Sequence, residues 1–224
     1  MEYVDGGSLA DLVDRCGPQQ VDMVSRVAAD VVHGLAHLHA QGMIHRDVKP
    51  GNILIDTCSG THKLCDWISD EEQGCSEHGS ATRRSKVARS APGLQALAVS
   101  PVGTPVFLAP EVVRTCKHCV SSDSWGLGCT LINLITGRLP WQEEDNVFAA
   151  MFKTAHGFAP PYSAHHMGVL VNDFLTLCFE PDATLRPDAK DLLEHPLCLR
   201  VLPTNQLELT PFTLRPPPAD SYQV

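Results

Sequence analysis

The ten residues His45–Leu54 place a carboxylate, a cation and an amide close together along the chain, in Asp47, Lys49 and Asn52. Phosphoryl transfer needs such groups, because a carboxylate must accept the proton of the attacking hydroxyl and a second group must hold a metal ion on the phosphates. Asp47 is the candidate proton acceptor, and Asn52 is a candidate ligand of magnesium. Chance is a poor explanation for so many residues of the required types at the required spacing in one short run.

The run 45–52, His-Arg-Asp-Val-Lys-Pro-Gly-Asn, resembles the catalytic loop of eukaryotic serine/threonine protein kinases. The resemblance implies transfer of the γ-phosphate of ATP, with Mg2+, to a serine or threonine of a protein substrate. It makes Asp47 the base, Lys49 the residue that touches the transferred phosphate, and Asn52 a metal ligand. It also places His45 in an internal apolar spine beside Trp67.

The first nine residues, MEYVDGGSL, look like the hinge of such a kinase. The resemblance makes Met1 the gatekeeper and brings the backbone of Glu2 and Val4 to the adenine edge of ATP. It puts Ser8 at the ribose and Leu54 in the apolar floor under adenine. Without its distance from Asp47, this segment would be no more than a strand end and a turn.

The tetrapeptide 65–68, Cys-Asp-Trp-Ile, stands where the family has its D-F-G motif. Asp66 would hold the magnesium ion that bridges the phosphates. Trp67 for phenylalanine is a mild departure, since both are large aromatic residues. Ile68 for glycine is a serious one, because a β-branched residue reaches glycine's backbone angles only with strain. We therefore expect the loop that places Asp66 to be shifted or stiff.

Residues 103–111, GTPVFLAPE, resemble the end of a kinase activation segment, in the version typical of MAP kinase kinase kinases and p21-activated kinases. The resemblance puts a hydrogen bond from Thr104 near Asp47 and Lys49. It pairs Glu111 with Arg186, and a buried carboxylate needs such a partner. Asp123 matches the family's helix-start aspartate, which steadies the backbone of the catalytic loop.

The activation segment would run over residues 66–111, and its middle is polar and contains the only basic run, Arg83–Arg89. Ser100 lies where related kinases have their activating phosphate, which an upstream kinase would add. A phosphate there would add about −1.5 to −2 charges, and Arg46 is its natural partner. The alternative is that Ser100 and Pro101 form only a turn in a solvated insertion.

The elements that must position these groups define an α+β fold, the mainly helical C-terminal lobe of a protein-kinase-like fold with short β hairpins around the catalytic loop. This domain would cover residues 1–199, and the Pro-rich tail 200–224 is expected to be disordered. Apolar spacing and end signals predict helices from Ser8, from Pro18 to Ala40, and over 125–135, 144–154, 166–179 and 188–194. Short apolar runs predict strands at Met43–Ile44, Ile53–Ile55 and Lys63–Cys65.

The composition excludes some classes of function. The formal net charge of −9 argues against non-specific nucleic-acid binding. No apolar run approaches the ~20 residues of a membrane helix, and the first residues do not resemble a signal peptide. Nine cysteines without a secretory signal indicate reduced thiols and a cytoplasmic protein. The pair Cys116 and Cys119 reads as two unrelated thiols, because a structural zinc site needs a second pair.

The 224 residues contain no glycine-rich loop of the form G-x-G-x-x-G and no V-A-I-K-like lysine, both of which kinases use to hold the phosphates. Two explanations stay open. The sequence is a fragment of an ordinary kinase that lacks the N-terminal lobe, or it is a catalytically inactive, pseudokinase-like C-lobe that acts as a protein-binding module. In either case we expect this polypeptide alone to be a very poor kinase.

Overall fold

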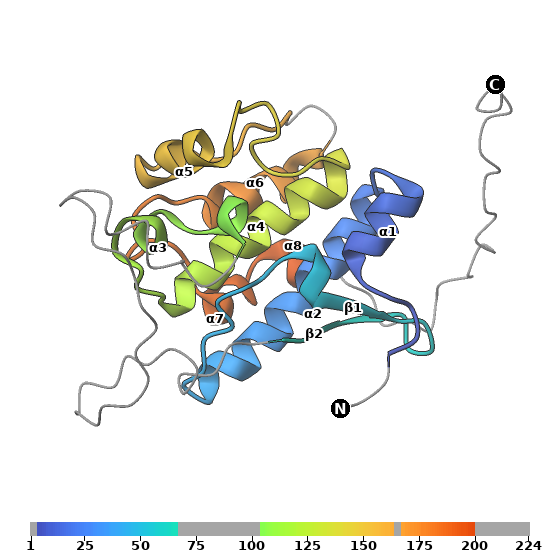
Figure 1. Ribbon diagram of the computed structural model, residues 1–224. Helices are drawn as coiled ribbons and strands as arrows, with labels where there is room; N and C mark the ends of the chain where they lie inside the picture. Colours follow the sequence, from blue (N-terminus) through green and yellow to red (C-terminus); the bar gives the residue numbers. More distant parts are fainter. Residues whose placement is uncertain (1–3, 67–103, 164–166, 200–224) are drawn as a thin grey trace, which may run out of the picture.

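The computed structural model describes residues 4–66, 104–163 and 167–199, and it is mainly helical with one small sheet (Figure 1). The longer helices are α1 (Leu9–Cys16), α2 (Val21–Ala40), α4 (Val120–Thr136), α5 (Val147–Ala155) and α6 (Gly168–Cys178). The short helical elements are η1 (Pro50–Asn52), η3 (Pro105–Phe107), α3 (Pro110–Thr115), α7 (Ala189–Leu192) and α8 (Pro196–Leu199). The strands are β1 (Ile53–Asp56) and β2 (Thr61–Leu64). This is the α+β arrangement that the sequence predicted.

Helix α4 runs through the middle of the molecule, with α2, α6 and α7 packed against it (Figure 1). It is buried along almost its whole length, as expected because the run from Trp125 to Ile135 is strongly apolar. Gly128 makes the packing against α6 possible, because a Cβ there would lie 2.9 Å from both Cys178 Cβ and a ring carbon of Phe179. The helix therefore forms the core on which the other elements are mounted.

Helix α2 has the predicted apolar stripe, with fully buried residues from Val24 to Leu35. It begins at Val21 rather than at Pro18, because the preceding residues run along the end of α4, where Gln19 N donates to Leu134 O at 2.7 Å. It ends at Ala40, and Gly42 follows with a φ of 75° that glycine tolerates best. α2 thereby delivers the chain to the start of the catalytic loop.

The sheet is a single antiparallel hairpin, in which Ile53 pairs with Leu64 and Asp56 with Thr61. It confirms two of the three predicted strands and packs β2 against α2. The prediction at Met43–Ile44 is wrong, since these residues belong to no strand in the described part of the chain, and Met43 N donates to Leu38 O at 3.1 Å. The hairpin connects the catalytic loop to Asp66, which directly follows Cys65 beyond β2.

Helices α3 and α8 were not predicted, because each is too short for an apolar period to be recognised. The predicted helix start at Ser8 is confirmed, and the structure shows a capping box there between Ser8 and Asp11. None of the described helices has the length and apolar character required to cross a membrane.

Candidate active site

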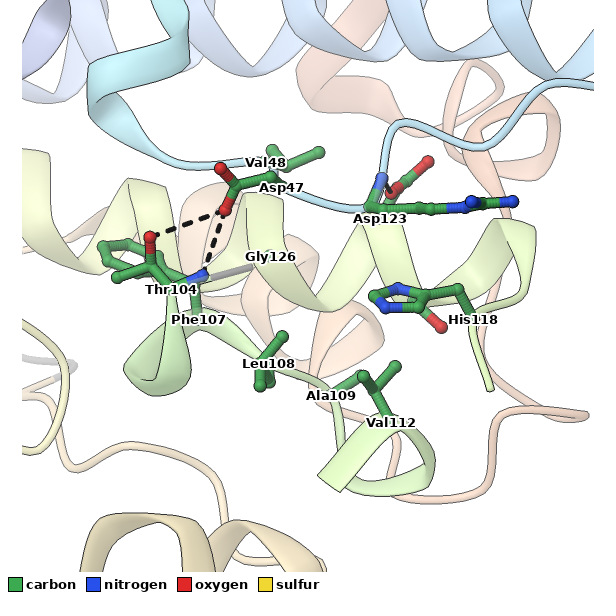
Figure 2. A pocket seen from close by; sticks show the side chains of 12 residues that line it. Asp47, Val48, Thr104, Phe107, Leu108, Ala109, Val112, His118, Asp123 and Gly126 are labelled. Atoms are coloured by element: carbon green, nitrogen blue, oxygen red, sulfur yellow. Dashed lines mark hydrogen bonds between the residues drawn. The ribbon is translucent and has the colours of Figure 1, made fainter. Parts of the chain in front are cut away.

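The carboxylate of Asp47 lies at the centre of a group of polar side chains. Its Oδ2 accepts hydrogen bonds from Lys49 Nζ at 2.6 Å and from Asn52 Nδ2 at 3.0 Å. Its Oδ1 accepts from the Thr104 backbone N at 3.1 Å, and Figure 2 shows Asp47 and Thr104 facing each other. Lys49 Nζ also donates to Thr104 Oγ1 at 2.9 Å. The structure thus brings together the four residues that the sequence predicted to be catalytic.

Asp123 fixes the backbone that presents Asp47. Its two carboxylate oxygens accept from the backbone N of His45 and of Arg46, both at 2.9 Å. Arg46 has a φ of 71°, which a non-glycine residue adopts only when its surroundings hold it there. The side chain of Asp123 is 1% exposed, so its hydrogen bonds are shielded from water. The geometry matches the predicted role of Asp123.

Sequence reasoning missed His39, whose Nε2 lies 2.8 Å from Asp123 Oδ2. Its side chain is 7% exposed, whereas His33 and His37 on the same helix are exposed. The available signal was its spacing: His39 lies four residues after Leu35 and so continues the apolar stripe of α2. A polar side chain on a buried stripe needs a partner, and Asp123 is that partner.

His45 and Asn52 hold the segment that leads to Asp66. His45 Nε2 lies 3.1 Å from Cys65 O, and Cys65 N donates to Asn52 O at 3.0 Å. Burial lowers the pKa of His45, although the charge of Asp123 and the Cys65 carbonyl act in the opposite direction. His45 is therefore neutral near pH 7, as suits a residue that holds the backbone of Cys65 in place rather than one that supplies a charge.

The side-chain oxygens near Asp47 suit a magnesium ion as ligands. This ion binds one or two carboxylates and completes its coordination shell with phosphate oxygens and water. The Asn52 amide directs its Nδ2 to Asp47, both to the carboxylate and to the backbone O at 2.9 Å, which leaves its oxygen as the acceptor for a cation. Asp66 is exposed and has a φ of 57°. Within the described ranges, no group of three or more His, Cys, Asp or Glu side chains could bind a metal by itself.

The segment predicted to border adenine lies against β1. Ser8 and Leu54 form an antiparallel bridge, and Gly6 N donates to Ile55 O at 3.0 Å. The Ser8 hydroxyl donates to Asp11 Oδ2 at 2.7 Å as part of the helix cap. Val4 is half-buried. Ser8 and Leu54 are therefore neighbours, as a shared nucleotide site requires, while their contacts with ATP stay predictions.

Glu111 and Arg186 form the ion pair that the sequence predicted. Nη1 and Nη2 of Arg186 donate to the two carboxylate oxygens of Glu111, at 2.8 and 3.0 Å. Ser122 Oγ donates to the same carboxylate at 2.8 Å. The guanidinium carbon lies 5.1 Å from the ring centroid of Trp125. This bidentate pair ties α3, and the segment that contains Thr104, to the loop between α6 and α7.

A small pocket separates the catalytic loop from the segment η3–α3 and the start of α4 (Figure 2). Asp47, Thr104, His118 and Gly126 are among the residues that line it. A Cβ on Gly126 would lie 3.0 Å from Val48 O, so glycine allows α4 to approach the catalytic loop closely. Met1, Glu2, Trp67, Ile68 and Ser100 lie outside the described residues, and their roles stay predictions.

Comparison with known proteins agrees with this geometry. The family model described as "Protein kinase domain" matches residues 1–198. The chain is 36% identical over 201 residues to Mitogen-activated protein kinase kinase kinase A of Dictyostelium discoideum, covering 90% of this chain and 19% of that protein. It is 37% identical over 198 residues to MAP3K epsilon protein kinase 2 of Arabidopsis thaliana, covering 88% and 13%. It is 35% identical over 199 residues to MAP kinase kinase kinase wis4 of Schizosaccharomyces pombe, covering 88% and 14%.

Proposed function

Because this chain belongs to the protein kinase domain family and to its MAP kinase kinase kinase group, we propose that it transfers the γ-phosphate of ATP to a serine or threonine hydroxyl of a protein. The observation that supports this most is the position of the Asp47 carboxylate, held between Lys49, Asn52 and Thr104. Such a carboxylate can accept the proton of an attacking hydroxyl. Phosphoryl transfer requires a positioned base and a nearby cation, and Asp47 and Lys49 would supply them.

Each residue of the site has a distinct role in the proposed phosphate transfer. Asp47 orients the hydroxyl and accepts its proton, and Lys49 stabilises charge on the transferring phosphoryl group. Asn52 and Asp66 bind magnesium, which neutralises phosphate charge when it is bound. Thr104 holds both Asp47 and Lys49 in place. Met1, Glu2, Val4, Ser8 and Leu54 form the nucleotide side of the site.

We propose that the protein substrate is a MAP kinase kinase, because the relatives are MAP kinase kinase kinases by name. The chain spans 13% to 19% of the three relatives compared above, so this assignment is a proposal for the present sequence. We also propose that the protein acts in the cytoplasm. An upstream kinase would activate it by phosphorylating Ser100.

The test measures transfer of labelled phosphate from ATP, with Mg2+, to a purified, catalytically dead MAP kinase kinase. The 224 residues contain no glycine-rich loop of the form G-x-G-x-x-G and no V-A-I-K-like lysine, so the chain alone should show only background transfer. The chain preceded by the upper lobe of one of its relatives should show transfer that Asp47→Asn lowers by about 10²–10⁴-fold.

Asp22→Asn is the matched control, because Asp22 is an exposed carboxylate in the first turn of α2. It should leave transfer unchanged. Transfer that survives Asp47→Asn would refute the assignment of the base. Absence of transfer in the two-lobed form would favour the second candidate, a binding module that uses the same fold.

A further inference from the structure

Helix α2 contains the only two of the eleven histidines that stand four residues apart, His33 and His37. Residues at this spacing lie one above the other on one face of a helix, with about 5–6 Å between their Cβ atoms. Both histidines are exposed, whereas Leu35 and Leu38 on the same turns are buried. We call His33 and His37 the histidine pair.

The fold does not use the histidine pair as it uses the neighbouring histidines. The side chains of His39 and His62 are 7% and 5% exposed, and each lies against a carboxylate, at 2.8 and 2.7 Å. His33 has no hydrogen bond or ion pair within the part of the chain that the structure describes. The two exposed rings are therefore available to a ligand from solvent.

Gln41 shows which form of the His37 ring faces solvent. The Gln41 side-chain Nε2 lies 2.7 Å from His37 Nε2 in an exposed contact. An amide nitrogen can only donate, so this ring nitrogen accepts with a lone pair. The lone pair of a neutral imidazole is the group that binds a transition metal. A metal ion that takes the place of Gln41 breaks only a surface hydrogen bond, which water can replace.

Two imidazoles at this spacing select the class of ion. Zn2+, Ni2+ and Cu2+ favour imidazole nitrogen, whereas Mg2+ favours oxygen ligands. Histidines at positions i and i+4 of a helix are also the ligands of helical zinc sites. No group of three or more His, Cys, Asp or Glu side chains within the described ranges could hold a metal ion. The histidine pair would therefore supply two ligands and leave the other coordination positions to water.

The histidine pair lies on the last turns of α2, which lead into the catalytic loop. His37 is two residues before His39, whose Nε2 contacts Asp123. Figure 1 shows that α2 ends near the lower edge of the molecule. A metal ion held by His33 and His37 would span one helical turn and keep that turn folded. The unfolded chain does not hold the two rings at this spacing, so the ion would bind the folded chain preferentially.

We propose that the histidine pair is a binding site for a divalent transition-metal ion of the zinc, nickel and copper class, held by one imidazole nitrogen of each residue. The site is separate from the magnesium ligands proposed at Asn52 and Asp66, and it does not depend on the proposed kinase function. Once one imidazole has bound, the second binds intramolecularly. The pair therefore binds the ion about 10²-fold more tightly than either histidine alone.

The test is calorimetric titration of the 224-residue chain with nickel(II) chloride, in the presence of excess Mg2+. The wild type should bind one equivalent at its tightest site, and His33→Gln and His37→Gln should each weaken that site by about tenfold to a hundredfold. His156→Gln is the matched control, because His156 is an exposed histidine at the C-cap of α5 with no histidine four residues away. All variants keep the nine cysteines, so binding by thiols is common to them.

Urea unfolding, followed by circular dichroism, gives a second measurement. Nickel(II) should raise the unfolding midpoint of the wild type by more than that of the double variant, because only the wild type gains the bridged turn. Equal affinity of the wild type and the double variant for nickel(II) would overturn the proposal, and so would equal weakening by His156→Gln. Absence of nickel(II) binding by the wild type, or its complete displacement by Mg2+, would overturn it as well.

Discussion

The pair Glu111–Arg186 gives the sharpest test of how the fold is held, through Glu111→Gln, Arg186→Met and the double variant. The side chain of Arg186 is 0% exposed and that of Glu111 is 13% exposed. Besides its two bonds to Glu111, Arg186 donates to Glu180 O at 2.8 Å and to Ser121 O at 3.1 Å. Both ends of the pair therefore depend on partners that water cannot replace easily.

The two single variants should differ in cost. Arg186→Met leaves the Glu111 carboxylate without its cation and removes donors from three backbone carbonyls, those of Glu180, Ser121 and Pro181. We therefore expect about 3–5 kcal/mol of destabilisation. Glu111→Gln keeps an amide oxygen for Ser122 and Arg186 but removes the negative charge, and hydrogen bonds to charged groups are worth about 1.5–3 kcal/mol. Since 1 kcal/mol moves the melting temperature of a domain this size by roughly 2–4 °C, Arg186→Met should lower it by roughly 6–20 °C.

The effect of Glu111→Gln should depend on pH. Burial raises the pKa of Glu111, but the hydrogen bonds and charge of Arg186 outweigh burial and hold this pKa below its ordinary value of 4.5. A carboxyl with a lowered folded-state pKa stabilises the fold at pH values above its unfolded pKa and loses that contribution as the pH falls through the folded pKa. The stability difference between wild type and Glu111→Gln should be complete at pH 6–7 and shrink below about pH 4.5.

The assay is urea unfolding of the four proteins, followed by circular dichroism. The cycle should give a coupling of about 1–3 kcal/mol between Glu111 and Arg186. The exposed pair Arg138–Glu143, at 3.8 Å with side chains 67% and 59% exposed, is the matched control. Its cycle should give less than about 0.5 kcal/mol. Additive effects of Glu111→Gln and Arg186→Met would refute the reasoning.

Two further changes test close packing and buried polarity. Gly6→Ala should destabilise by about 1–3 kcal/mol in urea unfolding, because its Cβ would lie 2.3 Å from Ile55 O, whereas Gly51→Ala would meet only Lys49 Cε at 3.9 Å and should be nearly neutral. Ser124→Ala should raise the free energy of unfolding by about 0.5–2 kcal/mol. The reason is that Ser124 is 0% exposed and its Oγ has no hydrogen-bond partner within the described residues. A clear loss of stability would contradict this and reveal a partner for that hydroxyl.

The candidate site was largely predictable because its residues lie in short contiguous motifs. Asp47, Lys49 and Asn52 are within six positions of one another, so the backbone alone brings them close. Asp123 and Arg186 were predictable only through resemblance to a family, since their partners lie 77 and 75 residues away along the chain. No local pattern contains information on such distant pairs.

What sequence reasoning missed depends on tertiary packing. The spacing of His39 places it on the apolar stripe of α2, but the sequence does not show that α4 brings Asp123 to it as a partner. The two short runs Met43–Ile44 and Ile53–Ile55 have the same apolar character, yet only the second has a partner strand in the described part of the chain. Strand formation needs that partner, because an isolated extended run leaves its backbone groups unpaired.

The first turn of α4 connects stability with the geometry of the site. Ser121, Ser122 and Asp123 are consecutive and all buried. The Ser121 carbonyl accepts a hydrogen bond from Arg186, and the Ser122 hydroxyl donates one to Glu111. The Asp123 carboxylate accepts one from the catalytic loop. One helical turn therefore holds both the ion pair and the backbone beside Asp47. Because the three residues share one rigid backbone, a variant that loosens Glu111 should also disturb the position of Asp47, even though it touches none of the reacting groups.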